Sequence, residues 1–414
     1  MRYASLSKLI ALLAVSLALC LPPAVFAQAA EKKDKDSAPA PTYDETTAKR
    51  LQEAIELLNT DQYEQARAVL GKLNMPKLSP YERSHVEQIL ASIDHSQENY
   101  DSARKHLEAA IAAGGLNEVE LSQVKYQIAQ LYMSQERWKE GAAALEDWFK
   151  TAVNANAGAY YLLAVAYYQI EQYERALTPA KKAVEMSEKP QESWIELIVA
   201  LYLQKEQYRE ALPYLEKLLA ISPDKKAHWL RLSSIYGQLE EYAKALAMMQ
   251  LAYNANLLSE DSEIRRLSDL LMFQEVPYRA AEVLATGLEK KQVKEDRGIF
   301  EKLANAWIAA REFSKAIQPL ERAAQMHNDG SLFVRLGEVQ VQRQDWDAAV
   351  TAFQRALDKG GLKDAPYVQY YIGIAFYSEK NYKDARTWFQ RAAASPKYAR
   401  SANAYIQIID SKKA

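Results

Sequence analysis

Residues 163–176 read LAVAYYQIEQYERA and contain the pattern that decides the fold. Within this stretch Tyr173 is followed three positions later by the small residue Ala176. The same step recurs along the chain at intervals of 33 to 38 residues, in Tyr63-Ala66, Tyr100-Ala103, Trp138-Gly141, Tyr173-Ala176, Tyr208-Ala211, Tyr242-Ala245, Tyr278-Ala281, Phe313-Ala316, Trp346-Ala349 and Tyr382-Ala385. So regular a period indicates a repeat protein, and an interval of this length indicates stacked pairs of helices.

Other positions repeat together with this step. An aliphatic residue such as Leu163 stands thirteen positions before the small residue, and an aromatic such as Tyr167 often stands nine before it. These apolar positions are three or four apart, so they form one stripe on a helix, and the small residue lets two helices approach closely. The pattern resembles the tetratricopeptide repeat over roughly residues 47–410. The resemblance implies an all-α fold, a right-handed superhelical solenoid of about ten helix pairs with a C-terminal capping helix.

The first 27 residues have a different character. Arg2 and Lys8 precede an apolar run over residues 9–21, which is shorter than the roughly 20 residues of a membrane span. Residues 25–27, which end with Ala27, then provide small or aliphatic residues at the positions that a signal peptidase recognises. We therefore predict a signal peptide over residues 1–27 and a soluble exported chain without a membrane span. Lipid attachment at Cys20 and an uncleaved anchor are the alternatives; Leu19 argues against the first, because a lipidated cysteine follows a small residue.

Residues 28–46 are rich in Ala, Lys, Asp and Pro, and we interpret them as a flexible charged leader. The remaining residues, 47–414, are predicted to form one continuous solenoid. One seam interrupts its pattern near residues 258–294, where Asp269 occupies the position of a small residue and Met272 that of an aromatic. The seam is either sequence drift in a tolerant repeat or a hinge.

The charge balance of the chain argues against some classes of binding partner. The chain has 52 Lys and Arg against 54 Asp and Glu, for a formal net charge of −2. No segment is strongly basic, which makes nucleic acid and anionic membrane surfaces poor candidates.

In the resembling family the first helix of each pair lines a concave groove. Carrying those positions over to this chain predicts a neutral groove rich in amides and aromatics, which suits an extended peptide or protein segment. The candidate groove residues are Tyr126, Gln130, Tyr161, Tyr168, Gln169, Gln204, Gln238, Tyr367, Tyr370 and Tyr377. Some members of that family bind the C-terminal carboxylate of a peptide through Lys, Arg and Asn at set groove positions. This chain lacks that pattern. The alternative is that this tyrosine-rich wall partly packs on itself.

Catalysis has little support in the sequence. No two of the five histidines, His85, His95, His106, His228 and His327, have the helical spacing of a metal pair, although two of the first three could meet in space. Without a phosphate loop or a nucleophile motif, we expect no enzyme, cofactor or metal. The layout of signal peptide, leader and repeats resembles periplasmic tetratricopeptide proteins that accompany TonB systems, which implies partners among TonB-system components. A scaffold for envelope assembly or polysaccharide export is the alternative.

Overall fold

The computed structural model describes residues 42–152 and 155–412. The predicted signal peptide and nearly all of the predicted leader lie outside these residues. Every regular element in the described ranges is helical, and none is a strand. The chain divides into two compact units, Met1–Ile221 and Ser222–Ala414, and each is described separately.

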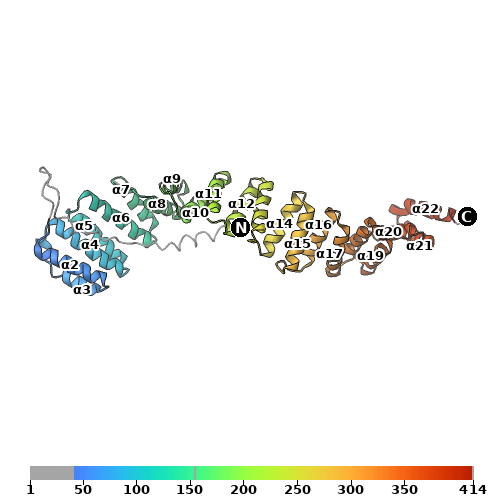
Figure 1. The fold of residues 1–414 in the computed structure, drawn as a ribbon, viewed down its shortest axis with the longest axis horizontal. Helices are drawn as coiled ribbons and strands as arrows, with labels where there is room; N and C mark the ends of the chain where they lie inside the picture. Colours follow the sequence, from blue (N-terminus) through green and yellow to red (C-terminus); the bar gives the residue numbers. More distant parts are fainter. Residues whose placement is uncertain (1–41, 153–154, 413–414) are drawn as a thin grey trace. The chain divides into compact units, whose positions relative to one another are not determined.

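The first unit contains five helix pairs in which the two helices of a pair pack side by side (Figure 1). A short 3-10 helix, η1 (Met75–Lys77), follows the first pair. The pairs are α2 (Glu45–Asn59) with α3 (Tyr63–Leu70), α4 (Pro80–Ser96) with α5 (Tyr100–Ala112), α6 (Glu118–Ser134) with α7 (Trp138–Phe149), α8 (Ala157–Gln169) with α9 (Tyr173–Glu185), and α10 (Glu192–Gln204) with α11 (Tyr208–Ile221).

The second unit contains five further pairs and one last helix, α22 (Pro396–Ser411), packed on α21. The pairs are α12 (Lys226–Gln238) with α13 (Tyr242–Asn254), α14 (Asp261–Phe273) with α15 (Pro277–Glu289), α16 (Arg297–Ala309) with α17 (Phe313–Met326), α18 (Ser331–Gln342) with α19 (Trp346–Lys359), and α20 (Ala365–Ser378) with α21 (Tyr382–Ala393). The prediction of an all-α fold of about ten pairs and a capping helix is confirmed.

Side chains at the predicted starts satisfy the free backbone N–H groups of several helices. Ser79 and Glu82 form a reciprocal capping box at α4, and Asn117 and Glu120 form another at α6. Such caps typically contribute about 1 kcal/mol each. Local sequence therefore fixes where these first helices begin.

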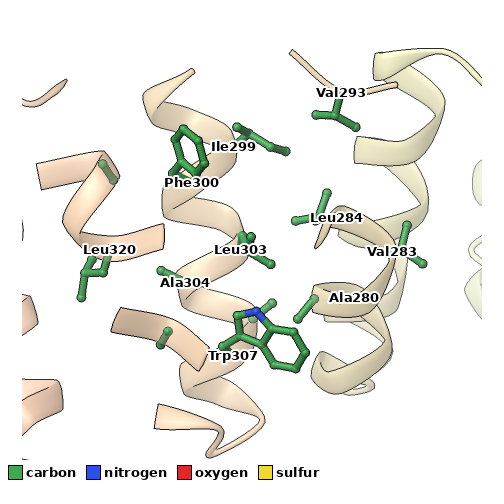
Figure 2. Packing of buried hydrophobic residues seen from close by; sticks show 14 of the residues in the cluster. Ala280, Val283, Leu284, Val293, Ile299, Phe300, Leu303, Ala304, Trp307 and Leu320 are labelled. Carbon is green, nitrogen blue, oxygen red and sulfur yellow. The ribbon is translucent and has the colours of Figure 1, made fainter. Parts of the chain in front are cut away.

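The small residues of the repeat lie where helices meet. Ala176 and Ala316 have no exposed surface, and the other alanines of the step are equally buried. Figure 2 shows the packing in the second unit, where Leu303 and Trp307 of α16 lie between side chains of α15 and Leu320 of α17. Each pair thus buries its apolar stripe against its neighbours, as expected of a repeat architecture.

The aromatic residues of the step are less buried than its small residues. Tyr173 and Trp346 are half-buried, and Tyr278 is 41% exposed. Each lies at the start of the second helix of a pair. Full burial belongs instead to aromatics inside the helices, such as Phe353 and Phe389.

The turn between the two helices of a pair contains one exposed residue with a left-handed backbone. In the first unit these residues are Asp61, Glu98, Glu136, Glu171 and Glu206, with φ between 55° and 60°. In the second unit they are Glu240, Glu275, Arg311, Gln344 and Lys380, with φ between 58° and 64°. Glycine is the residue usually favoured in this conformation, so the charged side chains here are unusual.

The division between the units falls after Ile221, before the predicted seam. Within the second unit one buried cluster runs through the seam and includes Leu258, Leu271 and Val293. However, α13 and α14 contact each other less than any other consecutive helices of that unit. Whether residues 258–294 act as a hinge stays a prediction.

Candidate binding surface

Glutamines recur at the end of the first helix of several pairs. In the first unit, Gln169 is the last residue of α8 and Gln204 the last of α10. In the second unit, Gln238 ends α12 and Gln342 ends α18. Gln204, Gln238 and Gln342 are exposed, and Gln169 is half-buried. These amide side chains therefore occupy equivalent places in four of the pairs, where they can both donate and accept hydrogen bonds.

Two of the candidate tyrosines of the first unit pack against tryptophans. Tyr161 is only 8% exposed, and its ring stacks on Trp194 with 5.5 Å between centroids. Tyr126 lies 4.7 Å from Trp148, measured between ring centroids. Burial raises the pKa of both tyrosine hydroxyls to about 12. The tyrosine-rich wall thus packs on itself here, which was the alternative that the sequence left open.

Tyr168 is more accessible than Tyr161, which lies on the same helix α8. It is half-buried, with its ring centroid 5.6 Å from that of Tyr173, and burial raises its pKa. Gln130 on α6 is also half-buried. Both residues retain surface that a ligand can contact, and their role in binding stays a prediction.

The three candidates on α20 lie in a cluster of aromatic rings between helices. Tyr370 stacks on Tyr398 of α22 with 5.8 Å between centroids, and Tyr377 lies 5.1 Å from Tyr405 of the same helix. The hydroxyl of Tyr367 donates a 2.7 Å hydrogen bond to Glu338. Burial and this carboxylate raise the pKa of Tyr367. Much of the surface expected to face a ligand is therefore used to attach the last helix.

Two of the three histidines of α4 and α5, His85 and His106, contact carboxylates, whereas the ring of His95 lies beside that of Tyr100. Nδ1 of His106 lies 2.5 Å from Glu87, and its Nε2 lies 3.4 Å from Asp94. Nε2 of His85 lies 3.4 Å from Glu120 of α6. These contacts tie neighbouring helices together.

Several hollows open on the helix faces of the described residues, and the two described below are the larger ones among them. The larger, of about 670 Å³, lies in the first unit among α7, α8 and α9, with Phe149, Tyr160 and Pro179 among its walls and Lys181 and Lys182 at its rim. It shares no residue with the predicted groove.

One hollow of the second unit has a volume of about 380 Å³ and lies between α16 and α18. It includes Gln342 from the glutamine row, together with Arg311 and Arg335. The expectation of a neutral groove missed these two arginines. Arg311 could have been noticed from the sequence, because it follows the first helix at the place where six earlier pairs have glutamate and one has aspartate.

Comparison with known proteins agrees with the class that this fold defines, a protein built of repeated helix pairs. A family model described as tetratricopeptide repeat matches residues 126–192, 198–256 and 334–408. The match supports a tetratricopeptide repeat protein, as the sequence pattern indicates. No curated protein matches the chain.

Several solved structures are similar to parts of the chain. A tetratricopeptide repeat protein from Parabacteroides merdae is 12% identical, with a TM-score of 0.35 over 71% of this chain and 99% of that one. The C-terminal part of a TPR repeat-containing protein from Cytophaga hutchinsonii is 14% identical, with a TM-score of 0.39 over 67% and 95%. YrrB, described as a TPR protein with an unusual peptide-binding site, is 16% identical, with a TM-score of 0.35 over 46% and 97%. Such low scores support no inference about a ligand.

A membrane span was also considered for the described ranges. Among the helices between residues 42 and 412 that the structure describes, none is both long enough and apolar enough to cross a bilayer.

Proposed function

We propose that the chain is a non-enzymatic scaffold that binds an extended segment of a partner protein along the first helices of its pairs. The observation that supports this most directly is the row of glutamines at the ends of those helices. Gln169 and Gln204 end the neighbouring first helices α8 and α10, both within the first unit. An extended backbone presents N–H and C=O groups that need partners, and an amide side chain can satisfy either kind.

We further propose that the protein acts outside the cytoplasm, in the periplasm, as an accessory of a TonB energy-transduction and iron-uptake system. Support comes from the signal-peptide pattern of residues 1–27 and from the layout of leader and repeats. A scaffold for envelope assembly or polysaccharide export rests on the same features. Adjacent genes for TonB and its motor favour the first assignment, and adjacent synthase or porin genes favour the second.

The location is tested by the intact mass of the protein purified from the envelope fraction. Cleavage after Ala27 gives a chain that begins at Gln28. A lipidated Cys20 or a retained Met1 contradicts the proposed export route.

Binding is tested by capturing envelope proteins on the immobilised chain. The double variant Gln169→Ala and Gln204→Ala, both in the first unit, should weaken capture at least about fivefold, since truncating a well-placed contact costs about 1 kcal/mol. Gln390→Ala with Gln407→Ala is the matched control, because these glutamines are exposed but lie on α21 and α22.

The outcomes separate the parts of the proposal. If the wild-type chain captures nothing, the scaffold assignment is wrong. If it captures proteins that are not TonB-system components, only the proposed partner is wrong. If the glutamine variant and the control capture equally, the partner binds away from the glutamine row.

A further inference from the structure

The hollow between α16 and α18 combines an apolar floor with a polar rim, and all of it lies within the second unit. Ile308, Phe313 and Val339 supply the apolar surface. Arg311, Arg335 and Gln342 supply the polar groups, and Glu338 lies beside them. At about 380 Å³ the hollow is large enough to receive side chains of a peptide.

The two arginines of this hollow differ from their neighbours. Arg322 lies 3.2 Å from Glu295, and Arg355 lies 2.8 Å from Glu321. In the described parts of the chain, Arg311 and Arg335 form no ion pair or side-chain hydrogen bond. Arg311 is exposed and Arg335 half-buried, so both guanidinium groups can be reached from solvent.

The one acidic residue of the hollow is already engaged. The Glu338 carboxylate accepts a 2.7 Å hydrogen bond from the hydroxyl of Tyr367. Its negative charge leaves the hollow with an excess of one positive charge. This charge is complementary to a carboxylate from another molecule.

The position of Arg311 provides an independent argument. In the six pairs from α4/α5 to α14/α15 the left-handed residue of the turn is glutamate, with φ between 55° and 60°. Arg311 has the same backbone conformation, with φ of 60°, but the opposite charge. The backbone demands no such change, since glutamate fits the same turn six times. The charge reversal occurs where the turn borders this hollow.

We propose that this hollow binds an acidic side chain of an extended protein segment, with a neighbouring apolar side chain resting on Ile308 and Phe313. This rests on the proposed function and specifies the chemistry of the partner. A guanidinium group presents a planar fork of donors that matches a carboxylate in two parallel hydrogen bonds. The apolar floor excludes water beside that contact and strengthens it, whereas fully exposed ion pairs contribute little.

The test uses two fluorescent peptides that are blocked at both ends, so neither has a terminal carboxylate. In one, leucine and glutamate alternate; in the other, glutamine replaces glutamate. Binding to the mature chain is measured by fluorescence anisotropy. We expect the glutamate peptide to bind about tenfold more tightly, because hydrogen bonds to charged groups are worth more than neutral ones. The difference should shrink as salt is added.

Substitutions then locate the binding. Arg311→Gln with Arg335→Gln should lower affinity for the glutamate peptide about tenfold. Arg322→Gln with Arg355→Gln removes the same charge from paired arginines and should change affinity less than about twofold. Arg335→Lys keeps the charge but loses the fork, so it should give an intermediate affinity. Unchanged far-ultraviolet circular dichroism verifies that each variant is folded.

Equal binding of the two peptides, binding of neither, or equal affinity in the Arg311 and Arg335 variant would overturn this inference. Partner capture separates it from the scaffold proposal. If envelope proteins are captured equally by the wild type and by that variant, the scaffold stands and the acidic-segment inference fails. If the glutamate peptide binds as expected but no envelope protein is captured, the scaffold assignment fails and the chemistry of the hollow stands.

Discussion

Substituting Gly337 by Ala tests the close approach of helices on which the repeat depends. A Cβ added at Gly337 would lie 2.5 Å from Cδ1 and Cε1 of Phe353 and 2.7 Å from its Cζ. Phe353 is completely buried, so its ring has no free space into which to move. Overpacking of this kind typically lowers the free energy of unfolding by roughly 1 to 3 kcal/mol. Replacing glycine by alanine in a helix raises it by about 0.5 to 1 kcal/mol. We expect a net destabilisation of about 1 to 2 kcal/mol.

Gly237 is the matched control, because it lies in a first helix of the same unit and its added Cβ would meet nothing within 4 Å. Gly237→Ala should therefore stabilise the protein slightly, by about 0.5 kcal/mol. Urea denaturation followed by circular dichroism gives the two changes. Hydrogen exchange of α18 and α19 shows whether the loss is local, as expected when pairs couple only to neighbours.

A double-mutant cycle identifies the cause. Phe353→Leu removes the ring, so the variant with both Gly337→Ala and Phe353→Leu should be more stable than the sum of the single effects by at least about 0.5 kcal/mol. If Gly337→Ala is as stable as the wild type, or if the two effects simply add, the close contact does not constrain the packing as we infer.

Three further expectations follow from the structure. Hydrogen exchange within the second unit should be fastest at residues 258–294, apart from the chain end; uniform protection there would show that the seam is sequence drift. Tyr161→Ala should destabilise the fold by about 3 kcal/mol in urea denaturation, because the ring is buried. A change near zero would instead indicate that the ring does not stabilise the fold and is available to contact a ligand. The hydrogen bond from Arg265, 2.7 Å long, lowers the pKa of the Asp261 carboxyl. The pair therefore stabilises the fold above the unfolded pKa of about 3.9, and this contribution is lost as the pH falls below that value. In Arg265→Met, the free energy of unfolding should consequently fall less steeply as the pH is lowered than it does in the wild type. An unchanged pH dependence below pH 4, roughly, would contradict the assignment.

The repeat itself could be predicted from the sequence because its small residues must lie where helices touch. Ala176 and Ala316 recur in register and are fully buried, so one spacing rule locates both. The position of the last helix was less certain. It begins at Pro396, because a proline preceded by Ser395 starts a helix before any apolar pattern appears.

The candidate surface was harder to predict, since groove positions depend on what lies opposite. Tyr161 occupies a groove position by spacing, yet Trp194 of the next pair covers it. Tyr370 is covered in the same way by Tyr398 of α22. Arg335 lies one residue away from a groove position carried over from the family. Selecting residues at those positions therefore does not identify it. Such neighbours vary from pair to pair and follow no period.

The charged residues in the left-handed turns have a consequence for the colloidal behaviour of the protein. In the first unit all five are acidic, from Asp61 to Glu206, and all are exposed at the same place of successive pairs. Two molecules that meet along this edge bring rows of like charges together and repel. At physiological ionic strength such repulsion extends only about 8 Å, so it acts just before contact and weakens as salt is added. For this edge, ionic strength rather than protein concentration alone controls how readily molecules adhere side to side.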